Sequence, residues 1–204
     1  MTRLRQIELL LVTAQTYVEA AIVPLTAELA EEHIHRAWWN DDILKDHFDE
    51  PPIDLDWNWN EMGIECQGRS LAAEKFAVFS GGTIQGAMLI STDPIGSVME
   101  PGKTALFLEL LFTAPRNRPK LRKDGKEFLK GVGLQMLIWA TRLSREQGHG
   151  GRLLLDGSPD YVQWYQNRGL QILSINPIVY EGVSYTPMEL PESSAKNLLA
   201  LWGE

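Results

Sequence analysis

The stretch from Ala105 to Asp156 constrains the fold of this 204-residue chain more than any other part of it. Ala105 to Thr113 is almost wholly apolar and predicts a strand that is buried on both faces. Gly133 to Gln147 carries apolar residues at helical spacing, and Arg152 to Asp156 is typical of a short apolar strand. A strand, a helix and a strand in this order predict a parallel pair joined by a right-handed crossover.

Antiparallel strands are predicted on both sides of this unit. Lys75 to Ser80 and Thr83 to Ser91 are apolar-rich runs joined by Gly81-Gly82, and a two-residue glycine connection is a strong hairpin signal. Gln171 to Ile175 and Ile178 to Tyr185 are two more strand-like runs. We therefore expect an α/β fold with a mixed, mostly antiparallel sheet, a central parallel pair and helices on both faces.

The first 65 residues are expected to be mainly helical. Their apolar residues recur at alternating spacings of three and four, which predicts one face of a helix that Pro24 kinks or breaks. These apolar positions are Leu4, Ile7, Leu11, Ala14, Val18, Ala21 and Leu25. The expected organisation is one domain over 1–204, with a helical N-terminal part (1–65) and a sheet core (70–185).

Composition excludes several classes of protein. Cys66 is the only cysteine, so no disulfide framework within the chain is possible, and we expect a cytoplasmic protein. The net charge of −8 argues against general nucleic-acid binding, and no apolar run is long enough to predict a membrane span. Only His33 and His35 are closely spaced among the histidines, and on a helix they face apart, so no metal site is expected.

The charge is unevenly distributed along the chain. Glu31 to Glu65 holds 11 acidic residues against 2 basic ones, whereas Arg116 to Lys130 holds 7 basic residues against 2 acidic ones. The acidic segment is either a solvated face or a surface that attracts cationic molecules. The basic segment is either a solvated loop or a source of cations for a phosphate group.

The basic segment leads directly into a glycine pair at a helix start, Lys130-Gly131-Val132-Gly133. Glycine lets the backbone approach a ligand closely, and the N-terminus of a helix favours a phosphate. The pattern lacks the Gly-Lys-Ser/Thr of the Walker loop and the three glycines of the dinucleotide fingerprint. The sequence here thus favours a phosphate site of another kind.

Two polar residues stand out near this junction. Glu109 is a lone carboxylate in an apolar strand, and Tyr165 lies on a helix predicted from Asp160 to Arg168. Both can converge near the carboxyl ends of the parallel strands, where binding crevices lie. Alternatively, Glu109 forms an ion pair with a core arginine, and Tyr165 is a packing residue.

The order and spacing of three segments resemble the GNAT superfamily of acyl-CoA N-acyltransferases over about residues 70–185. Phe107 to Pro115 looks like the fourth strand of that family, and Lys130 to Gly133 looks like the end of its Arg/Gln-x-x-Gly-x-Gly/Ala pyrophosphate loop. Tyr165 to Leu170 looks like its Tyr-x-x-x-Gly-Phe helix end. Glu109 to Gly169 is similar to a bacterial branch of the superfamily.

This resemblance implies a reaction and a set of site residues. An acyl group would pass from acetyl-CoA or another acyl-CoA, by direct attack, to a primary amine on a small molecule or a peptide. Glu109 would be the base and Tyr165 the acid. The residues expected to bind CoA are Leu111, Phe112, Thr113, Lys126, Lys130, Gly131, Val132 and Gly133. A homodimer is compatible with this class.

A second interpretation stays open beside the enzyme. Phe128 stands where the family loop has Arg or Gln, so Lys126 or Lys130 would have to replace that donor. This departure is compatible with a catalytically silent GNAT-like module that binds an acyl-CoA or a partner protein.

Overall fold

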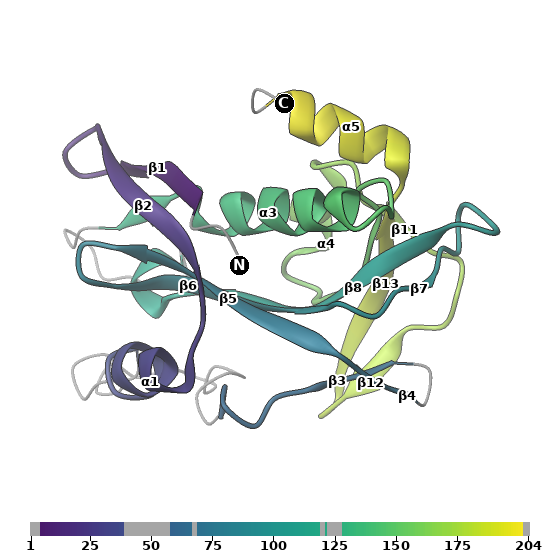
Figure 1. Cartoon of the computed structure of the whole chain (residues 1–204), viewed down its shortest axis with the longest axis horizontal. Coiled ribbons are helices and arrows are strands. Elements are labelled where there is room, and N and C mark those ends of the chain that lie inside the picture. Colours follow the sequence, from purple (N-terminus) through teal and green to yellow (C-terminus); the bar gives the residue numbers. More distant parts are fainter. Residues whose placement is uncertain (1–4, 39–57, 67–68, 119–120, 122–127, 202–204) are drawn as a thin grey trace. The chain divides into compact units, whose positions relative to one another are not determined.

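The computed structural model describes residues 5–38, 58–66, 69–118, 121 and 128–201 (Figure 1). The chain divides into two compact units. Unit 1 comprises Met1–Gly63, Lys75–Met88 and Leu111–Met136, and unit 2 comprises Ile64–Glu74, Leu89–Leu110 and Leu137–Glu204. The expected organisation as one domain over 1–204 stays a prediction.

Four elements contribute residues to both units. They are the strands β5 (Ala73–Ser80), β6 (Thr83–Ser91) and β8 (Thr104–Thr113) and the helix α3 (Val132–Glu146). The hairpin predicted around Gly81-Gly82 is confirmed as β5 and β6, and both glycines have the positive φ of such a turn, 59° and 76°.

Unit 1 contains the N-terminal strands and the first helices. Its strands follow the order β8-β6-β5-β2-β1-β9. Figure 1 shows α1 on one face of these strands and the start of α3 on the other. The elements not yet given bounds are β1 (Arg5–Leu11), β2 (Thr16–Pro24), α1 (Ala27–Ala30), a π-helical turn (Glu31–His35), a 3-10 turn (Pro115–Asn117) and β9 (Leu129–Lys130).

Unit 2 contains the C-terminal half of the sheet. Its strands follow the order β11-β13-β10-β8-β6, with β12 paired to β13 and β7 paired to β8, beside a small β3–β4 hairpin. The elements not yet given bounds are β3 (Ile64–Cys66), β4 (Arg69–Leu71), β7 (Ile95–Gly96), β10 (Leu153–Gly157), α4 (Val162–Gln166), β11 (Gln171–Ile172), β12 (Ile178–Tyr180), β13 (Val183–Leu190) and α5 (Glu192–Ala200).

The predicted sheet type is confirmed. β8 and β10 are parallel, and the helix between them is the predicted crossover element α3. The pairs β1–β2, β1–β9, β2–β5, β7–β8, β10–β13, β11–β13 and β12–β13 are antiparallel. The sheet is therefore mixed and mostly antiparallel. No helix in the described part of the chain is long and apolar enough to cross a membrane.

The helix predicted from Leu4 to Leu25 is wrong, because its described residues form the β1–β2 hairpin. Ile7 and Leu9 alternate on the buried face of β1. Ala14, which would complete the helical face, is exposed in the turn between the strands. Between residues 1 and 65, the described helical residues are α1 and the π-helical turn, and residues 39–57 lie outside the described part.

The C-terminal strand predicted from Ile178 to Tyr185 is also corrected. It is two strands, β12 and β13, joined by Glu181 and Gly182 at φ values of 49° and 79°. A two-residue turn with two positive φ angles reverses the chain, so Tyr180 pairs with Val183. The apolar run on both sides of the turn concealed it.

Gly86 on β6 sets how closely the start of α3 packs on unit 1. A Cβ atom at this position would lie 2.6 Å from Val132 Cγ1, 2.8 Å from Met136 Cε and 3.0 Å from the Phe112 carbonyl oxygen. Because one of these neighbours is backbone, the chain cannot accommodate a methyl group by a rotamer change alone. Gly86 therefore lets the glycine-flanked helix start lie directly against the sheet.

We predict that Gly86→Ala lowers the free energy of unfolding by about 1–3 kcal/mol because the added methyl group overpacks this contact. Urea denaturation measures the change. Gly96→Ala on β7 is the matched control, since a Cβ there would meet nothing within 4 Å. Equal stabilities of the two variants would contradict the packing argument.

Candidate active site

The candidate site begins where the two parallel strands stop pairing. The paired register of β8 and β10 ends at Leu154–Phe107, although β10 continues to Gly157 and β8 to Thr113. Beyond that point β10 still pairs with β13, where Asp156 lies opposite Pro187. Binding crevices form at such carboxyl ends of parallel strands, because strands that diverge leave room for a ligand between them.

Glu109 lies two residues beyond the last pair on β8. Its side chain is exposed, which corrects the prediction that the strand is buried on both faces. The alternative of an ion pair with a core arginine is not supported, since Glu109 forms no ion pair with any residue in the described ranges. Asp156, two residues beyond the last pair on β10, is half-buried. No local pattern in the sequence marks Asp156.

The surroundings of Glu109 raise the pKa of its carboxyl group. Partial loss of hydration and, next, the negative charge of Asp156 raise the pKa of Glu109 to about 7. Burial also raises the pKa of Asp156. A carboxyl group with a pKa near neutrality can both accept and release a proton at physiological pH, as a general base must.

Tyr165 lies on the short helix α4, against the end of β10. A Cβ on Gly157 would lie 3.6 Å from Tyr165 Cδ2 and 3.0 Å from Met188 Sδ, so the absence of a side chain at 157 leaves room for the tyrosine ring. The ring of Trp164 meets that of Tyr165 edge-on, with centroids 5.0 Å apart. The sequence thus places Tyr165 beside the strand end that carries Asp156.

The phenol of Tyr165 stays protonated. Burial and the neighbouring Tyr161 raise its pKa, and the nearby Arg168 guanidinium opposes this only in part. Arg168 itself stacks 3.7 Å from the centre of the Trp164 ring and donates to the Trp164 carbonyl at 2.7 Å. A protonated phenol can donate a hydrogen bond or a proton to a leaving anion.

The glycine-flanked helix start lies in unit 1. Gly131 has a φ of 94°, which an L side chain rarely adopts, and its carbonyl oxygen accepts the Gln135 N–H at 2.9 Å. Val132 and Gly133 then begin α3, where the first N–H groups have no partner within the helix. Lys130 is exposed beside them. This arrangement suits a phosphate group.

Asn117 closes the base of the basic segment, and no sequence signal marked it. Its Nδ2 donates to Gln85 Oε1 at 3.0 Å and to the Gln85 carbonyl at 3.2 Å, while its Oδ1 accepts the Leu129 N–H at 2.8 Å. The Phe128 carbonyl accepts the Val12 N–H at 3.2 Å. These bonds fix the strand β9 that delivers Lys130 and Gly131 to the helix start.

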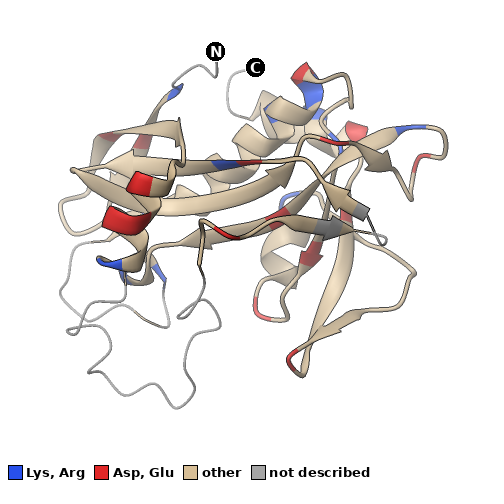
Figure 2. Ribbon diagram, turned by 60° about the horizontal axis from the view of Figure 1, so that its bottom comes forward, with Lys and Arg blue, Asp and Glu red and all other residues tan. Residues whose placement is uncertain are grey.

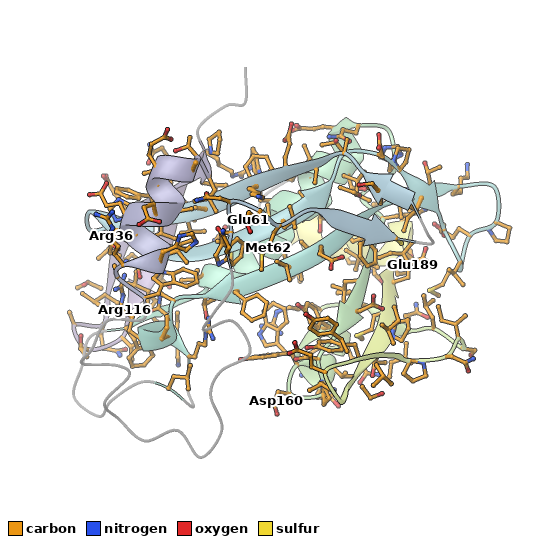
Figure 3. The ribbon with its side chains drawn as sticks, turned by 90° about the horizontal axis from the view of Figure 1, so that it is seen from below. Arg36, Glu61, Met62, Arg116, Asp160 and Glu189 are labelled. Carbon is orange, nitrogen blue, oxygen red and sulfur yellow. The ribbon has the colours of Figure 1, made fainter. Side chains whose placement is uncertain are left out.

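Two of the basic residues predicted to supply cations for a phosphate group donate hydrogen bonds within the fold instead. Arg116 donates to the Ile84 carbonyl and to Gln85 Oε1, both at 3.3 Å, and burial lowers its pKa (Figure 3). Arg118 donates to the Thr113 carbonyl at 2.6 Å and lies 5.4 Å from the centre of the Phe112 ring. Lys126 lies outside the described residues.

The remaining predicted residues are placed as follows. Leu111, Phe112 and Thr113 form the half-buried end of β8 in unit 1, whereas Glu109 and Tyr165 belong to unit 2. The described start of the acidic segment lies on the exposed surface around α1 (Figure 2), where Glu31 pairs with His35 and Arg36. No group of three or more potential metal ligands occurs among the described residues.

Comparison with solved structures identifies the fold. A candidate N-acetyltransferase from Lactobacillus plantarum aligns with 83% of this chain and 96% of its own, at 11% identity and a TM-score of 0.51. An acetyl-CoA-bound GNAT family acetyltransferase from Elizabethkingia anophelis covers 84% of this chain and 95% of its own, at 14% identity and a TM-score of 0.44. The structure of a bacterial toxin covers 65% of this chain and 73% of its own, at 17% identity and a TM-score of 0.48.

These likenesses rest on structure rather than on sequence. No protein-family model matches the sequence, and no curated protein matches it. The chain has the fold of the GNAT superfamily, as its strand order and its parallel pair indicate.

The raised pKa of Glu109 predicts a pH-dependent effect on stability. A carboxyl group whose pKa is higher in the folded state stabilises the fold when protonated, and this contribution is lost as the pH rises from about 4.5 to about 7. Glu109→Gln removes the titration. We therefore expect its melting temperature to exceed that of the wild type by a few degrees at pH 8 and to match it more closely at pH 4.5.

Differential scanning fluorimetry at several pH values measures this difference. Glu146→Gln, which removes an exposed carboxylate from the last turn of α3, controls for the loss of one negative charge. A Glu109→Gln variant whose melting temperature tracks the wild type at every pH would show that Glu109 titrates normally.

Proposed function

We propose that this protein is an acyl-CoA-dependent N-acyltransferase that transfers an acyl group to a primary amine. The observation that carries the proposal is the Glu109 carboxyl group, with a pKa of about 7, beyond the point where β8 and β10 stop pairing. An amine is mostly protonated near pH 7, so it must lose a proton before it attacks a thioester. Glu109 meets that requirement.

The proton steps balance with the groups at the site. Glu109 takes a proton from the acceptor ammonium group, and the free amine attacks the thioester carbonyl carbon. As the C–N bond forms, the C–S bond breaks, and Tyr165 gives its proton to the departing thiolate. The attacking nitrogen then loses a second proton, which passes through solvent to Tyr165 and restores its phenol. Glu109 releases the proton that it took from the ammonium group to bulk water. One proton is released per acyl group transferred.

The helix start in unit 1 supports binding of the CoA co-substrate. The backbone N–H groups of Val132 and Gly133, together with the exposed Lys130, would hold the pyrophosphate. The end of β8, Leu111 to Thr113, would carry the backbone groups that bind the pantetheine arm, and Lys126 would add a cation. The acceptor would be a small-molecule or peptide amine, with no metal ion and no nucleic acid involved.

The test is acyl transfer by the purified protein. Incubation with acetyl-CoA and a panel of amines should release free CoA, which a thiol reagent measures. Since positioned acid–base groups contribute about 10²–10⁴-fold each, Glu109→Gln and Tyr165→Phe should lower kcat by factors in that range. Tyr17→Phe, at an exposed tyrosine of β2, should leave kcat unchanged.

Two results would contradict the proposal. CoA binding in calorimetry without turnover of any amine would support the catalytically silent module instead, for which the apolar Phe128 in the loop is the specific observation. Turnover that survives both Glu109→Gln and Tyr165→Phe at the wild-type rate would reject the assigned roles.

A further inference from the structure

Asp156 occupies the position on β10 that matches Glu109 on β8. Leu154 and Phe107 are the last paired residues, and Asp156 and Glu109 each lie two residues further along their strands. Residues at matched positions of neighbouring parallel strands point to the same face of the sheet, and side chains two residues apart on a strand share that face. The two carboxylates therefore lie on the same face of the sheet, beyond the last paired residues of β8 and β10.

Neither carboxylate has a cation to neutralise it among the described residues. The nearby strand β13 contributes Glu189 opposite Leu154, but its carboxylate is fully buried and accepts the Val98 and Met99 N–H groups at 2.9 and 3.0 Å and the Ser97 hydroxyl (Figure 3).

The charged groups of the α4 region are also engaged elsewhere. Arg168 stacks on Trp164 and acts electrostatically on Tyr165, whose raised pKa keeps its phenol protonated. Within the described part of the chain, only a proton or a bound cation is therefore left to relieve the mutual repulsion of Glu109 and Asp156.

We propose that Asp156 is a positioning residue that shares one proton with Glu109 and, with it, binds the acceptor's ammonium group as a carboxylate pair. This inference rests on the proposed function and names the substrate class more narrowly. An ammonium group relieves the repulsion between the two carboxylates, whereas a carboxylate beside the amino group would add to it. The pair thus selects amines over α-amino acids.

The first test needs no turnover. Carbon-13 NMR of the side-chain carboxyl groups follows the titration of Glu109 in the wild type, in Asp156→Asn and in the control Glu146→Gln. We expect Asp156→Asn to move the midpoint of Glu109 to lower pH by about half a unit or more, because a like charge has been removed. The control should leave it in place. An unchanged midpoint in a folded Asp156→Asn variant would overturn the inference.

A reciprocal variant guards against loss of folding. If Asp156→Asn does not fold, the titration of Asp156 is followed in Glu109→Gln, where a midpoint shifted to lower pH supports the pair and an unshifted one rejects it.

The second test uses matched acceptors. The two acceptors are 2-phenylethylamine and phenylalanine, which differ by one carboxylate. The wild type should favour the amine by about tenfold or more in kcat/KM, and Asp156→Asn should lower that ratio. The acid limb of the kcat/KM profile should also move to lower pH in Asp156→Asn. Equal ratios in the two proteins would overturn the selection. A shifted Glu109 midpoint without turnover of any amine would support the pair and reject the proposed function, so the two failures are distinguishable.

Discussion

The loss of pairing between β8 and β10 is the constraint on which the rest of the candidate site depends. Side chains of a covered sheet are buried by the layers packed on its faces, so a carboxylate there must be paired or neutral. Past Leu154–Phe107 the two strands no longer pair, and Glu109 and Asp156, each two residues further along, have no neutralising cation among the described residues. Partial loss of hydration and their mutual repulsion then raise the pKa of Glu109 to about 7. A pKa near the physiological pH suits a base that takes a proton from an ammonium group.

Within each unit, small residues let functional elements approach the strands. Gly86 allows the start of α3 to lie against β6, and Gly157 leaves room for the ring of Tyr165 beside β10. Gly131 supplies the positive φ that turns β9 into the helix, and Asn117 fixes that turn through Gln85 and Leu129. Steric room and a few hydrogen bonds to backbone groups thus position the helix start and the Tyr165 ring. Arg116 and Arg118 donate hydrogen bonds to backbone carbonyl groups of unit 1.

Arrangements marked by local periodicity or turn residues were predictable, and those that depend on the register of distant strands were not. The β8–α3–β10 unit and the Gly81-Gly82 hairpin follow from local periodicity and turn chemistry, and Glu109 was conspicuous as a charge in an apolar strand. The β1–β2 hairpin was missed because its apolar residues also fit a helical spacing when they are counted across the turn. Asp156 and Asn117 carry no local signal, since the importance of each depends on the register of another strand.

The central claim is that Glu109 is the base of an acyl transfer. Its most direct test is the pH dependence of kcat/KM for acyl transfer in the wild type and in Glu109→Gln. The wild-type value should rise through an apparent pKa near 7, as the Glu109 carboxyl group ionises, and Glu109→Gln should lose both this limb and most of the rate. A Glu109→Gln variant that keeps the wild-type limb and rate would contradict the account.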